Sequence, residues 1–391
     1  MAEQADLIYL DYAASTPVDP WVAEAMTALM TADGNYANPS STHVAGRQSV
    51  EHIAHAAGQL ATLLNTDPLR LIWTSGATES DNLAILGGAH YRQKRGRHLI
   101  TMRTEHKAVT DAFTELERQG YSVTWLNPES SGLLDIAKLE EALRDDTQLV
   151  SIMHINNETG VVQDIAQIGA VCRERDILFH VDAAQSVGKL PIDLSALPVD
   201  LMSMTAHKVY GPKGIGALYI ADRPGVGVEP QLFGGGQQRR LRPGTQPAHQ
   251  IAGFGQAAEI ARASLHDDIE HLRRLRDRLW TGIADISGVV VNGSLETGFP
   301  GILNVSIEDV EGESLLLALE PLCVATGSAC NSKSQEPSYV LRALGRSDAL
   351  AQSAIRFSFG RPTTTAEIDI AVQKYRDAVT KLRVIAPEQS T

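Results

Sequence analysis

Short apolar segments alternate with helical patterns along residues 15–260, and this alternation limits the folds open to the chain more than any other feature. The predicted strands are residues 69–74, 98–102, 149–154, 177–181, 201–205 and 216–220. Strands that alternate with helices form a mostly parallel sheet whose faces the helices cover. The sequence therefore predicts an α/β fold.

A second structural unit is predicted in the last third of the chain. Residues 261–286 place apolar side chains at helical spacing, which predicts a connecting helix marked by Leu265, Ile269, Leu272, Leu275 and Leu279. Residues 302–307 and 322–325 resemble strands, and Thr364 followed by Glu367 is typical of a capping box at the start of a final helix. A chain of 391 residues suits two domains, so we expect a smaller α+β domain here.

The composition excludes several classes of protein. The formal net charge of -13 argues against general binding to nucleic acid or to anionic membranes. The amino terminus lacks the basic and apolar regions of a signal peptide, and no apolar stretch approaches the length of a membrane span. Cys172, Cys323 and Cys330 are too few for a disulfide framework and lack paired zinc spacing. We expect a cytoplasmic globular protein that binds no metal, no membrane and no nucleic acid directly.

Polar side chains end two neighbouring predicted strands. Asp182 and Gln185 end one strand, and Thr205, His207 and Lys208 end the next. Open α/β sheets bind ligands at these carboxyl ends. Pyridoxal phosphate needs a lysine for a Schiff base, a carboxylate beside its ring nitrogen, and hydroxyl and imidazole groups for its phosphate. Each segment alone also fits a solvated lysine or a turn aspartate, but together they predict a pyridoxal-phosphate site.

A small-residue turn precedes the first helix after strand 69–74. Residues 75–78 read Ser-Gly-Ala-Thr, and a helix is expected to start near Asp81. Small residues let backbone N–H groups approach a phosphate at the positive end of a helix. We assign Ala77 and Thr78 to phosphate binding, although this pattern by itself also fits an ordinary turn.

Several motifs, taken in order, resemble those of one enzyme family. They occupy residues 10–14, 34–41, 74–82, 104–107, 156–160, 179–185, 205–214, 242–245, 327–330 and 355–358. The chain resembles the cysteine desulfurases of the NifS/IscS type, in the class V aminotransferase group of fold-type I pyridoxal-phosphate enzymes. The resemblance implies a large cofactor-binding domain over residues 15–261, and a small domain formed by residues 1–14 and 262–391.

Further site residues are assigned with the help of this resemblance. His106 is expected to stack on the cofactor ring and to move a proton between substrate and thiol. Asn157 and Gln185 suit the ring hydroxyl, with Asn157 also placed at the substrate. Asn38 and Arg356 suit the α-carboxylate of the substrate. For Arg356, a buried structural ion pair is the alternative.

The resemblance also implies a homodimer with shared active sites, because Thr245 would reach the phosphate bound by the neighbouring subunit. Two motifs depart from the family pattern. Residues 205–208 read Thr-Ala-His-Lys where the family often has Ser-Gly-His-Lys, and residues 242–245 read Arg-Pro-Gly-Thr where it often has Arg-Ser-Gly-Thr. The hydroxyl groups of Thr205 and Thr245 are retained, so we expect both phosphate contacts to be retained too.

The three thiols differ in their sequence contexts. Cys172 and Cys323 lie in apolar segments and are expected to be inert core residues. Cys330 lies in a small and polar stretch, expected to form a mobile loop over about residues 326–337. Lys333 can favour its thiolate. Cys330 is therefore the candidate nucleophile.

The predicted activity is that of a cysteine desulfurase, a sulfurtransferase. Lys208 moves the α-proton of L-cysteine, Cys330 takes the sulfur as a persulfide, and L-alanine is left. The resemblance implies iron-sulfur scaffold proteins and tRNA thiolation factors as sulfur acceptors. The alternatives are a selenocysteine lyase, a small-amino-acid transaminase and a non-catalytic binding subunit. A transaminase has no need of a loop thiol, and intact Lys208, His106 and Cys330 argue against a non-catalytic role.

Overall fold

A seven-stranded sheet forms the centre of the structure, which is a computed structural model that describes residues 7–326 and 336–385. The strand order is β2-β8-β7-β6-β5-β3-β4; β3 to β7 are parallel, and β8 is antiparallel to both of its neighbours. The strands are β2 (Leu71–Thr74), β3 (His98–Met102), β4 (Ser122–Leu126), β5 (Thr147–Ser151), β6 (Leu178–Asp182), β7 (Leu201–Thr205) and β8 (Gly216–Ile220). The mostly parallel α/β sheet expected from the sequence is confirmed.

Both faces of this sheet are buried. Leu178 and Leu201 pack into one hydrophobic core, whereas the next residue in each strand, Phe179 or Met202, packs into another. Side chains alternate between faces along a strand. Because both faces are apolar, the strands appear in the sequence as continuous apolar runs.

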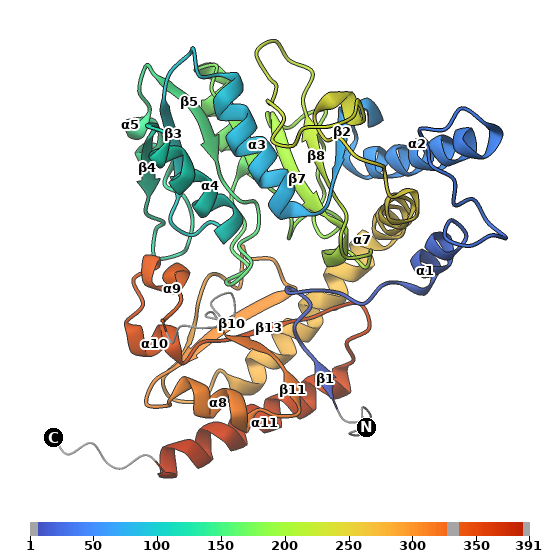
Figure 1. The fold of residues 1–391 in the computed structure, drawn as a ribbon. Coiled ribbons are helices and arrows are strands. Elements are labelled where there is room, and N and C mark those ends of the chain that lie inside the picture. The colour runs from blue at the N-terminus through green and yellow to red at the C-terminus, as the bar shows by residue number, and fades with distance from the viewer. Residues whose placement is uncertain (1–6, 327–335, 386–391) are drawn as a thin grey trace.

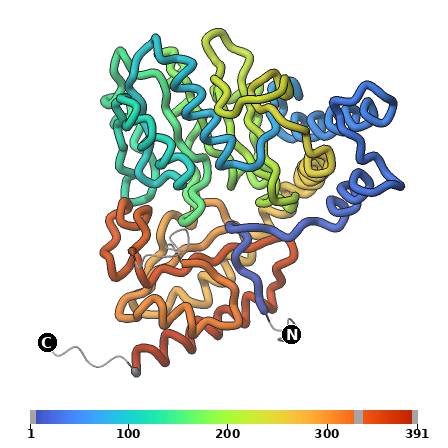
Figure 2. Tube along the Cα trace, viewed as in Figure 1, coloured from blue at the N-terminus to red at the C-terminus, as the bar shows by residue number. Residues whose placement is uncertain are grey.

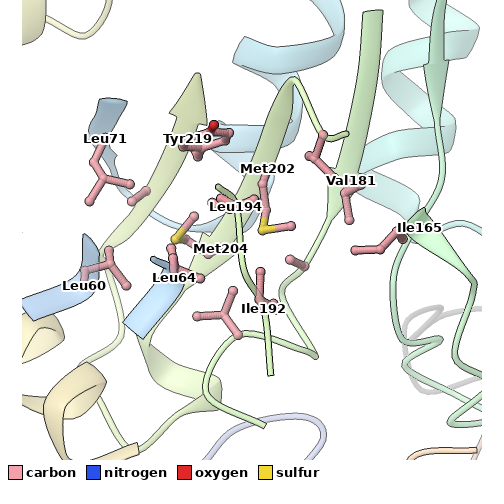
Figure 3. Packing of buried hydrophobic residues seen from close by; sticks show 14 of the residues in the cluster. Leu60, Leu64, Leu71, Ile165, Val181, Ile192, Leu194, Met202, Met204 and Tyr219 are labelled. Atoms are coloured by element: carbon pink, nitrogen blue, oxygen red, sulfur yellow. The ribbon is translucent and has the colours of Figure 1, made fainter. Parts of the chain in front are cut away.

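Helices cover the two faces (Figure 1). The core around Leu178 is completed by α3 (Ala77–Tyr91) and α4 (Lys107–Arg118). The core around Phe179 is completed by α2 (Val44–Leu64), α5 (Ile136–Ala142), α6 (Ile165–Glu174) and the first part of α7 (Ala248–Ile283). Figure 3 shows this second core from close by, with Leu60 and Leu64 of α2 in one cluster with Met204 of β7.

A smaller body lies below the large sheet in Figure 1. Its antiparallel sheet has the order β12-β13-β10-β9, and β1 pairs in parallel with β11. The strands are β1 (Ile8–Tyr9), β9 (Val289–Val291), β10 (Ile302–Ile307), β11 (Leu322–Cys323), β12 (Ala325–Thr326) and β13 (Ile355–Ser358). The helices are α8 (Gly312–Ala318), α9 (Tyr339–Ala343), α10 (Asp348–Gln352) and α11 (Thr365–Ile385).

One helix, α7, joins the two bodies (Figure 2). Phe254 packs in the core of the large sheet, and Leu279 packs in the core of the smaller body. The sequence predicted a start near residue 261, but α7 begins at Ala248. Its first turns carry small residues because other helices pack closely there: a Cβ at Gly255 would lie 2.5 Å from the Cα of Ala56 in α2. Glycine lowers helix propensity, so the local sequence concealed these turns.

Other boundaries also differ from expectation. The strand β4 was not predicted, because it is the edge strand of the sheet and has half-exposed and exposed positions. Helix α3 begins at Ala77 rather than near Asp81. The capping box at α11 is confirmed: the Thr364 amide donates to Glu367 Oε2 (2.6 Å) and the Glu367 amide donates to Thr364 Oγ1 (3.3 Å).

The helix α1 (Pro20–Thr27) packs against α7. Within the described ranges, no helix is both long enough and apolar enough to span a bilayer.

Candidate active site

A cleft of about 580 Å³ opens at the carboxyl ends of the parallel strands. It is lined by ten of the residues that the sequence analysis selected: Ala77, Thr78, His106, Asn157, Asp182, Gln185, Thr205, His207, Lys208 and Arg356. Asn38 and Thr245 do not line it, and Cys330 lies outside the described residues. Residues far apart in the sequence thus meet where open α/β sheets place their ligands.

Asp182 and Lys208 come from adjacent strands. Asp182 is the last residue of β6 and pairs in register with Ser203 of β7. Lys208 ends a short 3-10 turn that begins directly after β7. The carboxylate of Asp182 accepts a hydrogen bond of 2.9 Å from the Ala184 amide, which orients it at the strand end.

The amino terminus of α3 faces the cleft with Ala77 and Thr78. Its N-cap, Gly76, supplies no side-chain hydrogen bond to the first turn, and its φ of 154° is a conformation that side chains rarely adopt. The first-turn N–H groups of a helix attract anions. This end of the cleft therefore suits a phosphate group, with the Thr205 side chain nearby.

His106 is the N-cap of α4, which the sequence did not reveal. Its Nδ1 accepts a hydrogen bond of 3.2 Å from the Ala108 amide. The neutral ring therefore carries its proton on Nε2. Burial, together with the charge of Lys208, lowers the pKa of His106 against the opposing effect of Asp182. The neutral imidazole is favoured near pH 7.

The amino-terminal segment holds the turn that carries Lys208. Both the amide and the hydroxyl of Thr16 donate to the carbonyl of His207, each at 2.9 Å. The Tyr210 amide donates to the Thr16 hydroxyl at 2.8 Å. Burial and the charges of neighbouring lysines, Lys208 first, lower the pKa of His207 to about 4. His207 is therefore neutral at pH 7 and can donate only one ring N–H.

The Arg356 side chain is anchored on two sides. It donates a hydrogen bond of 2.8 Å to the carbonyl of Asn157 and one of 2.7 Å to the carboxylate of Asp11. Its buried Nε has no hydrogen-bond partner in the described part of the chain. Both interpretations of Arg356 therefore have a structural basis: it forms an ion pair, and it also lines the cleft with a donor left for a ligand.

Two buried acids near Asp182 were missed by the sequence analysis. Asp81 of α3 and Glu105 are fully buried. Burial first, and then the charge of Asp182, raise the pKa of Asp81 and of Glu105 well above the usual range. Burial thus disfavours the charged form of both carboxyl groups. Their positions inside the motifs 74–82 and 104–107 were visible, but their burial was not.

Two further titratable residues were also missed. Glu158 lines the cleft and accepts a hydrogen bond of 2.5 Å from the Ser338 hydroxyl, and burial raises its pKa to about 7. Lys189 donates to Gln185 at 2.9 Å. Each could have been found from its position in the sequence next to a selected site residue. Glu158 directly follows Asn157, and Lys189 lies four residues after Gln185.

The two described thiols occupy different environments. Cys172 of α6 is fully buried in the core of the large sheet, and burial raises the pKa of its thiol. Cys323 was expected to be a core residue, but it is only half-buried. It lies in the two-residue strand β11, next to the buried Leu322, and successive side chains of a strand point to opposite faces.

Asn38 and Thr245 are both exposed. Asn38 accepts a hydrogen bond of 2.9 Å from the Ser40 amide. Arg242, three residues before Thr245, forms an ion pair of 2.9 Å with Glu79 of α3. This pair holds the segment beside the amino terminus of α3 without bringing Thr245 into the cleft of its own chain.

Comparisons with known proteins agree with this geometry. Residues 8–370 match the family described as Aminotransferase class-V. Cysteine desulfurase IscS of Cronobacter sakazakii is 58% identical over 97% of this chain and 94% of the relative, and the Escherichia coli K12 protein has the same identity and coverage. A solved NifS-like protein superposes with a TM-score of 0.89 and 35% identity over 96% of this chain and 100% of that protein. The structure described as SspA in complex with cysteine superposes with a TM-score of 0.81 and 39% sequence identity. The match covers 91% of this chain and 100% of that chain. The chain therefore belongs to the class V aminotransferase family, and within it to the cysteine desulfurases of the NifS/IscS type.

Proposed function

We propose that this protein is a pyridoxal-phosphate-dependent cysteine desulfurase that converts L-cysteine to L-alanine and a persulfide on Cys330. One observation carries the proposal: Lys208 and Asp182 lie at the ends of adjacent strands, in one cleft with His106 and Arg356. The relatives named IscS, which are similar over 97% of this chain, support the same activity.

The groups at two ends of the cleft fit pyridoxal phosphate. The amino terminus of α3 with Thr78, together with Thr205 and His207, would hold the phosphate. Lys208 would bind the aldehyde carbon. The bound cofactor supplies an electron sink, which makes the hydrogen on the substrate α-carbon acidic.

The ring of the cofactor has partners between these ends. The Asp182 carboxylate would pair with the ring nitrogen, and the amides of Gln185 and Asn157 would contact the ring hydroxyl. His106 would stack on the ring face. A neutral imidazole suits that position because it adds no second charge beside Lys208.

The substrate carboxylate would bind at Arg356. The guanidinium is already oriented by the Asn157 carbonyl and the Asp11 carboxylate. Its remaining donors include the buried Nε. A guanidinium can bind a carboxylate through two parallel hydrogen bonds. We retain Asn38 as a second carboxylate ligand in the proposal, although it does not line the cleft of its own chain.

Proton transfer would use Lys208 and His106. Lys208 removes the proton from the α-carbon of cysteine. The ring of His106 would pass the proton given up by the substrate thiol to the carbon that is released when the carbon-sulfur bond breaks. The Cys330 thiolate takes the sulfur, so the products together contain the atoms of L-cysteine and one thiol.

Cys330 remains the proposed nucleophile on the basis of its surroundings in the sequence and the exclusion of Cys172. Thr326 lines the cleft, and Cys330 lies only four positions after it in the sequence. An extended peptide of that length spans at most about 14 Å. The thiol of Cys172 is fully buried, and burial favours its protonated form.

We further propose a homodimer in which Thr245 completes the phosphate site of the other subunit. Its exposed position next to a segment anchored by Arg242 and Glu79 supports this. The sulfur acceptors would be iron-sulfur scaffold proteins or tRNA thiolation factors. Three cysteines in 391 residues suit a reducing compartment, and we propose the cytoplasm.

We also propose that residues 15–261 form the large cofactor-binding domain, and that residues 1–14 with 262–391 form the small one. The separate hydrophobic cores support this division. Ala261 is the last residue of α7 in the core of the large sheet, and Leu272 is the first in the core of the smaller body.

The test is to incubate the purified holoenzyme with L-cysteine and a reductant and to measure alanine and sulfide together. Equal amounts of both products are expected. Keto acid production without sulfide would contradict the proposal and would instead favour a transaminase.

A further inference from the structure

Lys189 is a half-buried residue whose ammonium group the proposed reaction does not use. Its Nζ donates a hydrogen bond of 2.9 Å to Oε1 of Gln185 and lies 5.9 Å from the centre of the Phe299 ring. It forms no ion pair with any carboxylate of the residues that the structure describes. Burying an ammonium group without an opposite charge is costly. A purely structural role would be served better by an apolar side chain.

The charged groups around Lys189 increase this cost. Burial, then the positive charges of Lys208 and Arg356, lower its pKa to about 7. Lys189 and Lys208 line the same small cavity behind the cleft. Arg361 and Asp268 also face that cavity, but they form an ion pair of 2.9 Å with each other.

The backbone brings Lys189 to this place through Gly188. Gly188 has a φ of 72°, and a Cβ there would lie only 2.3 Å from Cγ2 of Val209. Glycine therefore allows the turn after Gln185 to lie directly against the residue that follows Lys208. The position of Lys189 depends on this close approach.

The contacts of Gln185 determine which way its amide points. Nε2 donates a hydrogen bond of 2.8 Å to the carbonyl of Ala13, and Oε1 accepts from Lys189. A carbonyl can only accept and an ammonium group can only donate, so just one orientation of the amide satisfies both. Gln185 lines the cleft, and its second Nε2 hydrogen is the group left for a ligand.

We propose that Lys189 is a positioning residue that holds the Gln185 amide with Nε2 toward the cleft, as a donor to the ring oxygen of pyridoxal phosphate. Without Lys189, Oε1 of Gln185 would be buried with no donor, and the side chain would lose its single orientation. The inference rests on the proposed function, because it requires that pyridoxal phosphate bind in this cleft.

The test compares two ligands that differ only in the ring oxygen. Apoenzyme prepared from the holoenzyme is titrated with pyridoxal phosphate and with 3-deoxypyridoxal phosphate, and the ratio of the two dissociation constants is determined. In the wild type the deoxy compound should bind about tenfold more weakly, which corresponds to one hydrogen bond. In Lys189→Met the ratio should fall by about threefold or more, as it should in Gln185→Met, while the contact proposed for Asn157 remains in both variants.

Two further variants make the comparison specific. Lys213→Met removes another charge from the cleft but leaves the contacts of Gln185 intact. It should weaken the binding of both ligands equally and leave the ratio of their dissociation constants unchanged. Adding Lys189→Met to Gln185→Met should cause no further fall in the ratio, because the two residues act through one contact.

The outcomes separate the inference from the proposed function. A wild-type ratio retained in folded Lys189→Met would overturn the inference. If Lys189→Met does not fold, as judged by circular dichroism, Lys189→Ala, which also lacks a donor, replaces it and must also lower the ratio. A wild-type protein that binds neither ligand would instead contradict the proposed cofactor.

Discussion

The Arg356 guanidinium donates a hydrogen bond of 2.7 Å to the carboxylate of Asp11, although 345 positions separate the two residues in the sequence. This contact joins β13 to the segment that follows β1, at the edge of the cleft. It orients the guanidinium, so the same residue can support the fold and receive a substrate carboxylate.

Arg356→Lys should therefore raise the KM for cysteine about tenfold or more, because an ammonium group cannot keep both anchors and bind a carboxylate in parallel. The absorption of the bound cofactor should be unchanged. Steady-state kinetics and a visible spectrum test this. Arg376→Lys, in an exposed ion pair with Asp285, is the matched control and should keep the wild-type KM. An unaltered KM in Arg356→Lys would remove Arg356 from the substrate site.

Lys208→Ala should abolish turnover and the visible absorption band of lysine-bound pyridoxal phosphate, because Lys208 is the residue proposed to bind the aldehyde. Borohydride treatment followed by peptide mapping checks the assignment. Lys213→Ala, from the same side of the cleft, should still be labelled by borohydride at Lys208. A persistent band in Lys208→Ala would refute the role of this lysine.

Cys330→Ala should bind pyridoxal phosphate and cysteine but release no sulfur, because the thiol acts after the substrate has bound. Cys172→Ala should keep turnover and lose about 1–2 kcal/mol of unfolding free energy, because its side chain fills a buried site. Cys323→Ala should also keep turnover. Mass spectrometry after brief exposure to cysteine locates the added sulfur, and sulfur found on Cys172 or Cys323 would contradict the mechanism.

Mixed dimers test the role of Thr245. Thr245→Ala and Lys208→Ala should each be nearly inactive alone. If Thr245 serves the partner's site, each mixed dimer has one intact site, so an equal mixture should recover about a quarter of wild-type activity. No recovery in dimers shown to be mixed would place Thr245 at the site of its own chain.

The stability of the protein should fall in acid, partly because of His154. Burial lowers the pKa of His154 to about 4, below its usual 6.5. The folded state therefore binds fewer protons than the unfolded state between these values, and the contribution of His154 is present above pH 6.5 and is lost as the pH falls toward 4.

Replacing His154 with glutamine should thus reduce the loss of unfolding free energy between pH 7 and pH 5 by about 2 kcal/mol. Urea unfolding of wild type and variant at both pH values gives this difference directly. Equal pH dependence in the two proteins would show that His154 is not held neutral in the fold.

The sequence was most informative where structure is local. The strands β3, β7 and β8 have the bounds that were predicted, because each is a continuous apolar run between polar turns. The edge strand β4 and the first turns of α7 were missed. In both, the structure depends on the neighbouring elements. The strand β4 has a neighbouring strand on one side only, and the first turns of α7 carry small residues because another helix packs closely against them.

The sequence by itself determined the type of fold and the chemical groups at the strand ends, since Asp182, Thr205 and Lys208 follow directly from apolar strands. Only the tertiary structure decided which of these groups have partners and which charges are favoured. The pairing of Lys189 with Gln185 and the raised pKa values of Asp81 and Glu105 are of this kind. Hydrogen-bond orientation and pKa depend on distance and desolvation, and these arise only when distant segments of the chain pack together.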